Sequence, residues 1–180
     1  MNPSSHSIEL IEFITSGDAA AQPVASVIVL HGLGADGSDF VPVAQAMDLS
    51  AVGPVRFVFP SAPVRPVTIN GGYEMRAWYD IFPPGPDGTR REDEPGLRDA
   101  QAIVQQLVER ELQRGVPADR VVLMGFSQGC AMTLLAGAVG VDAFAWQLDP
   151  FEHAPSWATV RRDALVNSHF AVKGVHMLTL

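Results

Sequence analysis

The sequence predicts an α/β fold built on a mostly parallel sheet with helices on both faces. Three short apolar runs, at residues 24–30, 55–59 and 121–124, are rich in β-branched residues and bounded by Gly or Pro, which is typical of buried parallel strands. Between the last two runs, residues 96–114 place their apolar side chains mainly on one helical face, after an acidic start. This alternation of strand and helix predicts the fold class.

Length and composition favour one globular domain spanning residues 1–180. With 180 residues, 47% of them hydrophobic and 18% charged, the chain is long enough to bury a core. A net charge of -8 argues against a nucleic acid or an anionic membrane as partner, because both require a basic surface. A small, weakly polar molecule fits better.

The N-terminal segment and the cysteine content bear on the location of the protein and on disulfide or metal sites. The first residues lack a basic region followed by an apolar core, and no apolar stretch is long enough to span a bilayer, so we expect a cytoplasmic protein without membrane insertion. A single cysteine excludes an intramolecular disulfide, and the five histidines do not have metal-ligand spacing. We therefore expect no metal and no cofactor.

The first predicted strand ends in a glycine-rich turn, residues 32–37, with the pattern GxGxxG. Such a turn can hold the pyrophosphate of a dinucleotide, but then the next strand should end in a ribose-binding carboxylate. That strand ends instead in Pro60-Ser61-Ala62-Pro63. The alternative is an oxyanion hole, in which backbone amides of the turn face a developing negative oxygen.

A long segment, residues 60–95, has no sustained periodicity and contains half of the prolines in the chain. Connections of this length within a compact domain are usually functional, and we interpret it as a pocket wall. Its apolar residues either line an acyl channel or plug the segment onto the core; they are Tyr73, Met75, Trp78 and Tyr79.

A candidate nucleophile lies in the sequence GFSQG, residues 125–129, directly after a predicted strand and before an apolar helix starting near Cys130. In this context GxSxG forms a sharp elbow that exposes the serine, here Ser127, while side chains at the glycine positions would collide with backbone. A buried, inert thiol is the simplest interpretation of Cys130.

The two motifs explain each other as parts of an α/β-hydrolase. Attack by Ser127 on an ester creates an oxyanion that needs two amide donors, one from the residue after the serine, Gln128, and one from a loop after an earlier strand. The HGLG turn supplies that loop, with Leu33 as donor. His31 precedes the serine and belongs to the turn, so we expect it to make structural hydrogen bonds rather than act as the base.

Three separated segments resemble the bacterial carboxylesterase, lysophospholipase and acyl-protein thioesterase family of α/β-hydrolases. They are VIVLHGLGADGSDFVPVA, RFVFPSAPVRPVTINGGYEMRAWYDI and DRVVLMGFSQGCAM, and the likeness runs over about residues 24–138. The resemblance implies hydrolysis of small-molecule carboxylic esters, thioesters or lysophospholipids without a cofactor. It also implies Ser127 as nucleophile, Leu33 and Gln128 as oxyanion donors, and Met75 with Trp78 in the acyl wall.

The resemblance ends near residue 140, which leaves residues 24–140 as a family-like core and 141–180 as an atypical tail. Only 53 residues follow Ser127, whereas each further strand-helix unit takes roughly 30 residues, so an acid and then a histidine hardly fit. The catalytic Asp and His therefore stay unassigned. The tail does contain residues of the right types: Asp149, Asp163, His153, His169 and His176.

These departures predict a C-terminally incomplete fold. A shifted reading frame or a truncated gene after Gly140 would explain the abrupt loss of family sequence. The leading hypothesis is a serine esterase of low efficiency, and the alternative is a non-catalytic remnant. A sheet ending at the elbow strand would expose an apolar edge, through which we expect dimerisation or aggregation.

Overall fold

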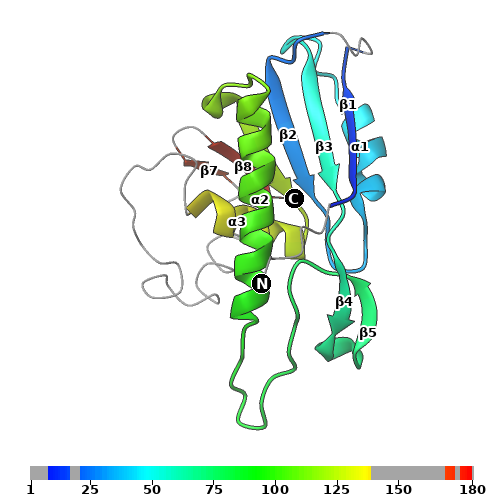
Figure 1. The fold of residues 1–180 in the computed structure, drawn as a ribbon, viewed down its shortest axis with the longest axis vertical. Coiled ribbons are helices and arrows are strands. Elements are labelled where there is room, and N and C mark those ends of the chain that lie inside the picture. Colours follow the sequence, from blue (N-terminus) through cyan, green and yellow to red (C-terminus); the bar gives the residue numbers. More distant parts are fainter. Residues whose placement is uncertain (1–7, 17–20, 139–168, 173–174, 180) are drawn as a thin grey trace, which may run out of the picture.

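The computed structural model describes residues 8–16, 21–138, 169–172 and 175–179. At its centre lies a six-stranded sheet with the order β1-β3-β2-β6-β8-β7 (Figure 1). The four inner strands run parallel, and the two outer strands run antiparallel to their neighbours. The strands are β1 (Leu10–Ile14), β2 (Ala25–Leu30), β3 (Val55–Pro60), β6 (Val121–Gly125), β7 (His169–Val172) and β8 (Val175–Thr179). The predicted mostly parallel sheet is confirmed.

The three predicted strands match β2, β3 and β6 to within one residue at each end. All six residues of β3 are buried, as expected for a central strand covered on both faces. Side chains alternate between two buried clusters, one on each face of the sheet, with Val58 in one and Phe57 in the other.

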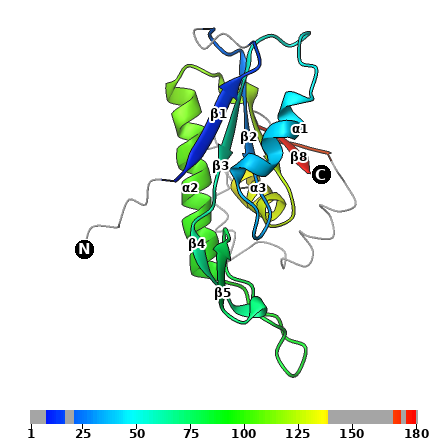
Figure 2. The same cartoon turned by 90° about the vertical axis from the view of Figure 1, so that its right-hand side faces the viewer.

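Helices cover both faces of the sheet, as the sequence predicts. The long helix α2 (Glu94–Gln113) and the helix α3 (Gln128–Ala138) pack on one face, and the short helix α1 (Val41–Gln45) packs on the other (Figures 1 and 2). The described residues also form three 3₁₀ turns: η1 (Gly37–Phe40), η2 (Thr68–Asn70) and η3 (Ala118–Arg120).

Charged groups fix α2 to the sheet. Its predicted acidic start is confirmed, because the Asp93 carboxylate caps the helix by accepting from the Gly96 amide at 3.1 Å. Near the other end, Glu111 is buried and pairs with Arg56 of β3 at 2.8 Å. Glu12 of β1 receives hydrogen bonds from Arg114 and Arg110, and the bond from Arg114 is the main cause of its lowered pKa.

Two parts of the fold were not anticipated from the sequence. β1 pairs antiparallel with β3 at the edge of the sheet. Within residues 60–95, interpreted above as an irregular pocket wall, β4 (Val64–Val67) and β5 (Tyr73–Arg76) form an antiparallel hairpin that projects from the body of the molecule (Figure 2).

The sheet does not end at β6 as expected. β8 pairs with β6 in parallel, from Val121 opposite Val175 to Gly125 opposite Thr179, and β7 continues the sheet beyond it. The expectation of an exposed sheet edge at β6 is therefore wrong, because backbone from the tail pairs with this strand. No helix among the described residues is long and apolar enough to cross a membrane.

Candidate active site

Ser127 occupies a sharp turn between a strand and a helix. β6 ends at Gly125 and α3 begins at Gln128, so only Phe126 and Ser127 connect them. Ser127 has a φ of 54° and is the one non-glycine residue with positive φ in the part of the chain that the structure describes. Such strained backbone clusters at functional sites. Ser127 is also exposed, at the carboxyl end of the parallel strands.

The glycines on either side of Ser127 are required by close packing. A Cβ on Gly125 would lie 2.3 Å from the carbonyl oxygen of Gly129, and a Cβ on Gly129 would lie 2.1 Å from that of Leu30. The predicted collision with backbone is confirmed, so the elbow is part of the structure and not a chance occurrence of GxSxG.

The HGLG loop lies against this elbow. A Cβ on Gly32 would lie 3.2 Å from the Cβ of Ser127. Gly34 has a φ of 76°, and its amide donates to the carbonyl of Arg76 at 2.9 Å. Among the hydrogen bonds of the described residues, none has the amide of Leu33 or of Gln128 as donor. The structure thus brings the turn that leads into Leu33 against Ser127, and Gln128 follows Ser127 directly in the chain.

His31 supports the loop and has no capacity left to act as a base. Its ring is fully buried, Nε2 accepts from the Ala62 amide at 2.9 Å, and Nδ1 donates to the Gly32 carbonyl at 2.7 Å. Because the Ala62 N–H must donate, the ring carries its proton on Nδ1 and is neutral. Burial lowers the pKa of His31 below its ordinary value of 6.5, which favours the same state.

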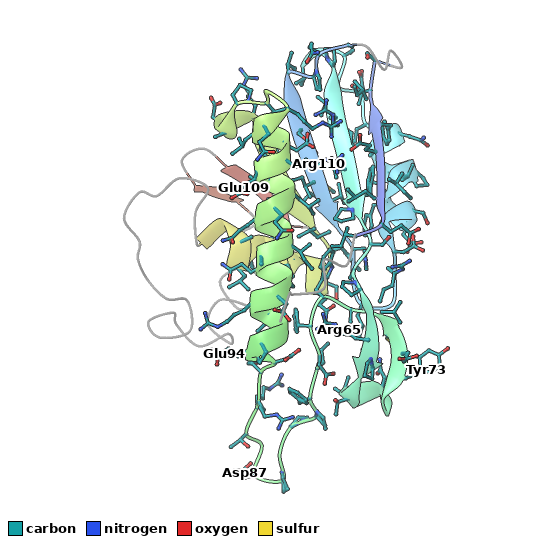
Figure 3. All side chains as sticks on the ribbon, in the orientation of Figure 1. Arg65, Tyr73, Asp87, Glu94, Glu109 and Arg110 are labelled. Carbon is teal, nitrogen blue, oxygen red and sulfur yellow. The ribbon has the colours of Figure 1, made fainter. Side chains whose placement is uncertain are left out.

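The predicted acyl-wall residues occupy different positions. Met75 is half-buried, and its sulfur lies 3.7 Å from the position of a Cβ on Gly34, beside the loop. Trp78 is fully buried beneath the loop, where its indole Nε1 donates to the His31 carbonyl at 2.9 Å, so it supports the loop instead of facing an open pocket. Tyr73 is 71% exposed and points away from the body of the molecule (Figure 3), which removes it from the expected channel.

The side chain of Gln128 makes contacts that sequence reasoning missed. Its Oε1 accepts from the Trp78 amide at 2.7 Å, and its Nε2 donates to the Tyr79 carbonyl at 2.8 Å. Only the backbone of Gln128 was expected to matter. One feature of the sequence could have pointed to these contacts. Gln128 is a polar residue at the start of a helix that the elbow motif places against the core.

Of the tail residues weighed as acid or base, Asp149, Asp163 and His153 lie outside the described residues. His176 pairs with Val122, near the start of β6, whereas His169 pairs with Leu178, which itself lies opposite Met124. The backbone of His169 is thus at the carboxyl end of the sheet, two strands from β6. Among the described residues, no cluster of His, Cys, Asp and Glu could hold a metal ion.

The arrangement of elbow and loop agrees with the family that the chain matches. The phospholipase/carboxylesterase family model fits residues 10–142, which is most of the chain and includes β1. The chain belongs to this family. The resemblance inferred from three motifs is confirmed, and the α/β-hydrolase fold with it.

Similar proteins of this phospholipase/carboxylesterase family include acyl-protein thioesterases of fungi. Acyl-protein thioesterase 1 of Neurospora crassa is 42% identical over 125 residues, covering 66% of this chain and 50% of the relative. Acyl-protein thioesterase 1 of Schizosaccharomyces pombe is also 42% identical, over 113 residues, covering 63% of this chain and 49% of the relative. The chain thus spans about half the length of the curated relatives it matches.

Solved structures agree with this assignment. Arabidopsis thaliana SOBER1 is 33% identical with a TM-score of 0.57, covering 63% of this chain and 54% of its own. Acyl-protein thioesterase 2 of Zea mays is 26% identical with a TM-score of 0.57, covering 72% of this chain and 51% of its own.

Proposed function

We propose that the chain hydrolyses carboxylic esters or thioesters through an acyl-enzyme formed on Ser127. The single observation that carries the proposal is the exposed, strained Ser127 lying against the Gly32 turn. The relatives named acyl-protein thioesterases favour an acyl group carried on sulfur as well as on oxygen. Lysophospholipids are a further substrate class of the proposal.

In the proposed reaction, the Ser127 oxygen bonds to the carbonyl carbon of the substrate while its proton passes to a base. The carbonyl oxygen becomes an oxyanion, which accepts hydrogen bonds from the amides of Leu33 and Gln128. Collapse of this intermediate breaks the bond to the leaving alcohol or thiol, which takes up the proton. Water then attacks the acyl-enzyme by the same route and releases the acid.

The second candidate function is a non-catalytic remnant that retains the elbow without turnover. One observation favours it: His31, the histidine beside the oxyanion turn, is buried, neutral and bonded through both nitrogens, so it cannot take the proton of Ser127. We therefore propose a weak hydrolase, with the catalysis of roughly 10³ to 10⁴ over water that oxyanion donors and binding supply when a triad is incomplete. A cytoplasmic location and dimerisation stay predictions.

Hydrolysis of p-nitrophenyl acetate, p-nitrophenyl butyrate and a short acyl thioester tests the proposal. We expect slow turnover that Ser127→Ala abolishes. The matched control is Cys130→Ala, since Cys130 is a half-buried residue of the same helix whose burial raises the thiol pKa and leaves it unreactive. Full activity in Ser127→Ala would place the nucleophile elsewhere, and no turnover in either protein would favour the remnant.

A further inference from the structure

The two proposed oxyanion donors come from separate elements, whose relative position must be fixed if both amides are to reach one oxygen. Leu33 lies in the loop after β2, and Gln128 is the first residue of α3. Residues 78 and 79, which follow the β4–β5 hairpin, are hydrogen-bonded to both elements. This third segment is therefore a bridge between the two halves of the site.

The first link of the bridge is the carboxamide of Gln128. It is 4% exposed and makes two hydrogen bonds to adjacent backbone groups, accepting from Trp78 N–H at 2.7 Å and donating to the Tyr79 carbonyl at 2.8 Å. A side chain that both accepts and donates fixes the bridge in two directions. Loss of either bond would leave a buried polar group unsatisfied.

The second link is the indole of Trp78. It is fully buried, its Nε1 donates to the His31 carbonyl at 2.9 Å, and its ring lies 5.4 Å from the His31 ring. The His31 carbonyl belongs to the peptide that leads into Gly32, directly before the oxyanion donor. The indole thus orients the start of the loop.

We propose that the side chains of Gln128 and Trp78 are positioning residues that act in series, holding the Leu33 and Gln128 amides at the separation an oxyanion requires. The proposal rests on the proposed function of Ser127. In a series connection, cutting either link interrupts the path through residues 78 and 79, so cutting both adds little. Independent structural roles would instead give effects that multiply.

The kinetic test uses Gln128→Met, which keeps the length of the side chain, Trp78→Phe, which removes the indole N–H, and the double variant. We expect each single variant to lower kcat on p-nitrophenyl butyrate on the order of 10²-fold with KM little changed, because misplaced donors weaken the transition state alone. The double variant should resemble the worse single variant. A double loss near the product of the two single losses would overturn the proposal.

A destabilised control separates positioning from general loss of stability. Leu107→Ala creates a cavity under α2 and removes none of the hydrogen bonds of the bridge, so it should lower the melting temperature without the loss of kcat. If Leu107→Ala reduced kcat as much as Gln128→Met at an equal melting temperature, the proposed positioning would be wrong.

Hydrogen exchange gives a readout that does not require turnover. In Gln128→Met, the amides of residues 31–35 should exchange faster than in the unmodified chain, although the substitution is in another element, while those of residues 94–113 should be unchanged. Unaltered exchange at residues 31–35 would overturn the proposal. Failure of the proposed function would appear differently, as absence of Ser127-dependent hydrolysis in the unmodified chain.

Discussion

Gly129 lies directly against the carbonyl group of Leu30, and a Cβ on Gly129 would stand 2.1 Å from its oxygen. Leu30 is the last residue of β2, and its carbonyl also accepts from the Phe126 amide at 3.0 Å. The strand that leads into the oxyanion loop and the helix that follows the serine therefore meet at the carbonyl group of Leu30. Their relative position depends on the missing side chain of Gly129.

Gly129→Ala should displace α3 from β2, because the added carbon has only backbone to meet. Overpacking of this kind typically costs about 1–3 kcal/mol, and we expect the free energy of unfolding to fall by a similar amount. Ser127-dependent hydrolysis should be lost as well. Thermal unfolding and ester turnover check this, with Cys130→Ala as a neighbour that should keep both; a Gly129→Ala protein with normal turnover would contradict the packing argument.

Replacement of either glycine in the loop by valine should damage the site. At Gly34 the φ of 76° strains any branched residue, and at Gly32 a side chain would press on Ser127 at 3.2 Å. We expect a loss of activity in both variants, with Gly34→Val also melting at a lower temperature. If turnover and melting both stayed normal, the oxyanion assignment would have to be withdrawn.

His31 predicts a pH dependence of stability. Burial lowers its pKa in the folded state below 6.5, so under acid conditions the unfolded chain binds a proton that the folded chain does not. Stability contributed by neutral His31 is therefore present above pH 6.5 and is lost as the pH falls, by at most about 1.4 kcal/mol per pH unit. Melting followed between pH 7 and 5 should show a shallower slope in His31→Asn; an equal slope would argue against a buried neutral ring.

The ion pair between Arg56 and Glu111 predicts a large effect of a single substitution and a smaller effect of a double substitution. Their side chains are 9% and 1% exposed, so Glu111→Ala leaves a buried guanidinium without its partner. Such a loss costs about 3–5 kcal/mol, whereas replacing both partners with apolar residues of similar volume is often neutral. In urea unfolding, the double variant Arg56→Met/Glu111→Leu should have a higher free energy of unfolding than Glu111→Ala. The reverse order would contradict a buried ion pair.

Backbone register separates two histidines of the tail. His176 lies opposite Val122, three residues and about 10 Å before β6 ends, while His169 is placed at the carboxyl end. We expect His176→Ala to leave the hydrolysis rate unchanged and His169→Ala to lower any rate that a base supports. Loss of activity in His176→Ala alone would mean that the tail pairs in another register.

The strands β2, β3 and β6 and the helix α2 could be predicted because their evidence is local: β-branched runs ended by glycine or proline, and apolar residues on one helical face. The pairing of the HGLG turn with GxSxG was also readable, since each motif requires the other chemically. Each of the two motifs is itself a run of residues adjacent in the sequence.

The rest depended on contacts between distant residues. β1 has a mixed burial pattern and gains its definition from β3, and the hairpin β4–β5 lies in a proline-rich segment without clear periodicity. For Trp78 the sequence left open a place in an acyl channel or on the core, and the resemblance implied the acyl wall; only its hydrogen bond to His31 shows that it supports the loop. The role of the Gln128 carboxamide was missed because its partners, residues 78 and 79, lie about fifty residues away in the sequence.

The central claim is that Ser127 is an activated nucleophile facing an oxyanion hole, and covalent labelling tests it most directly. The purified chain is incubated with a fluorophosphonate probe, digested, and the modified residue is located by mass spectrometry, with Ser127→Ala and a heat-denatured sample as controls. The account predicts slow labelling confined to Ser127 and absent from both controls. A folded chain in which Ser127 stays unmodified, or in which other serines react equally, would contradict it.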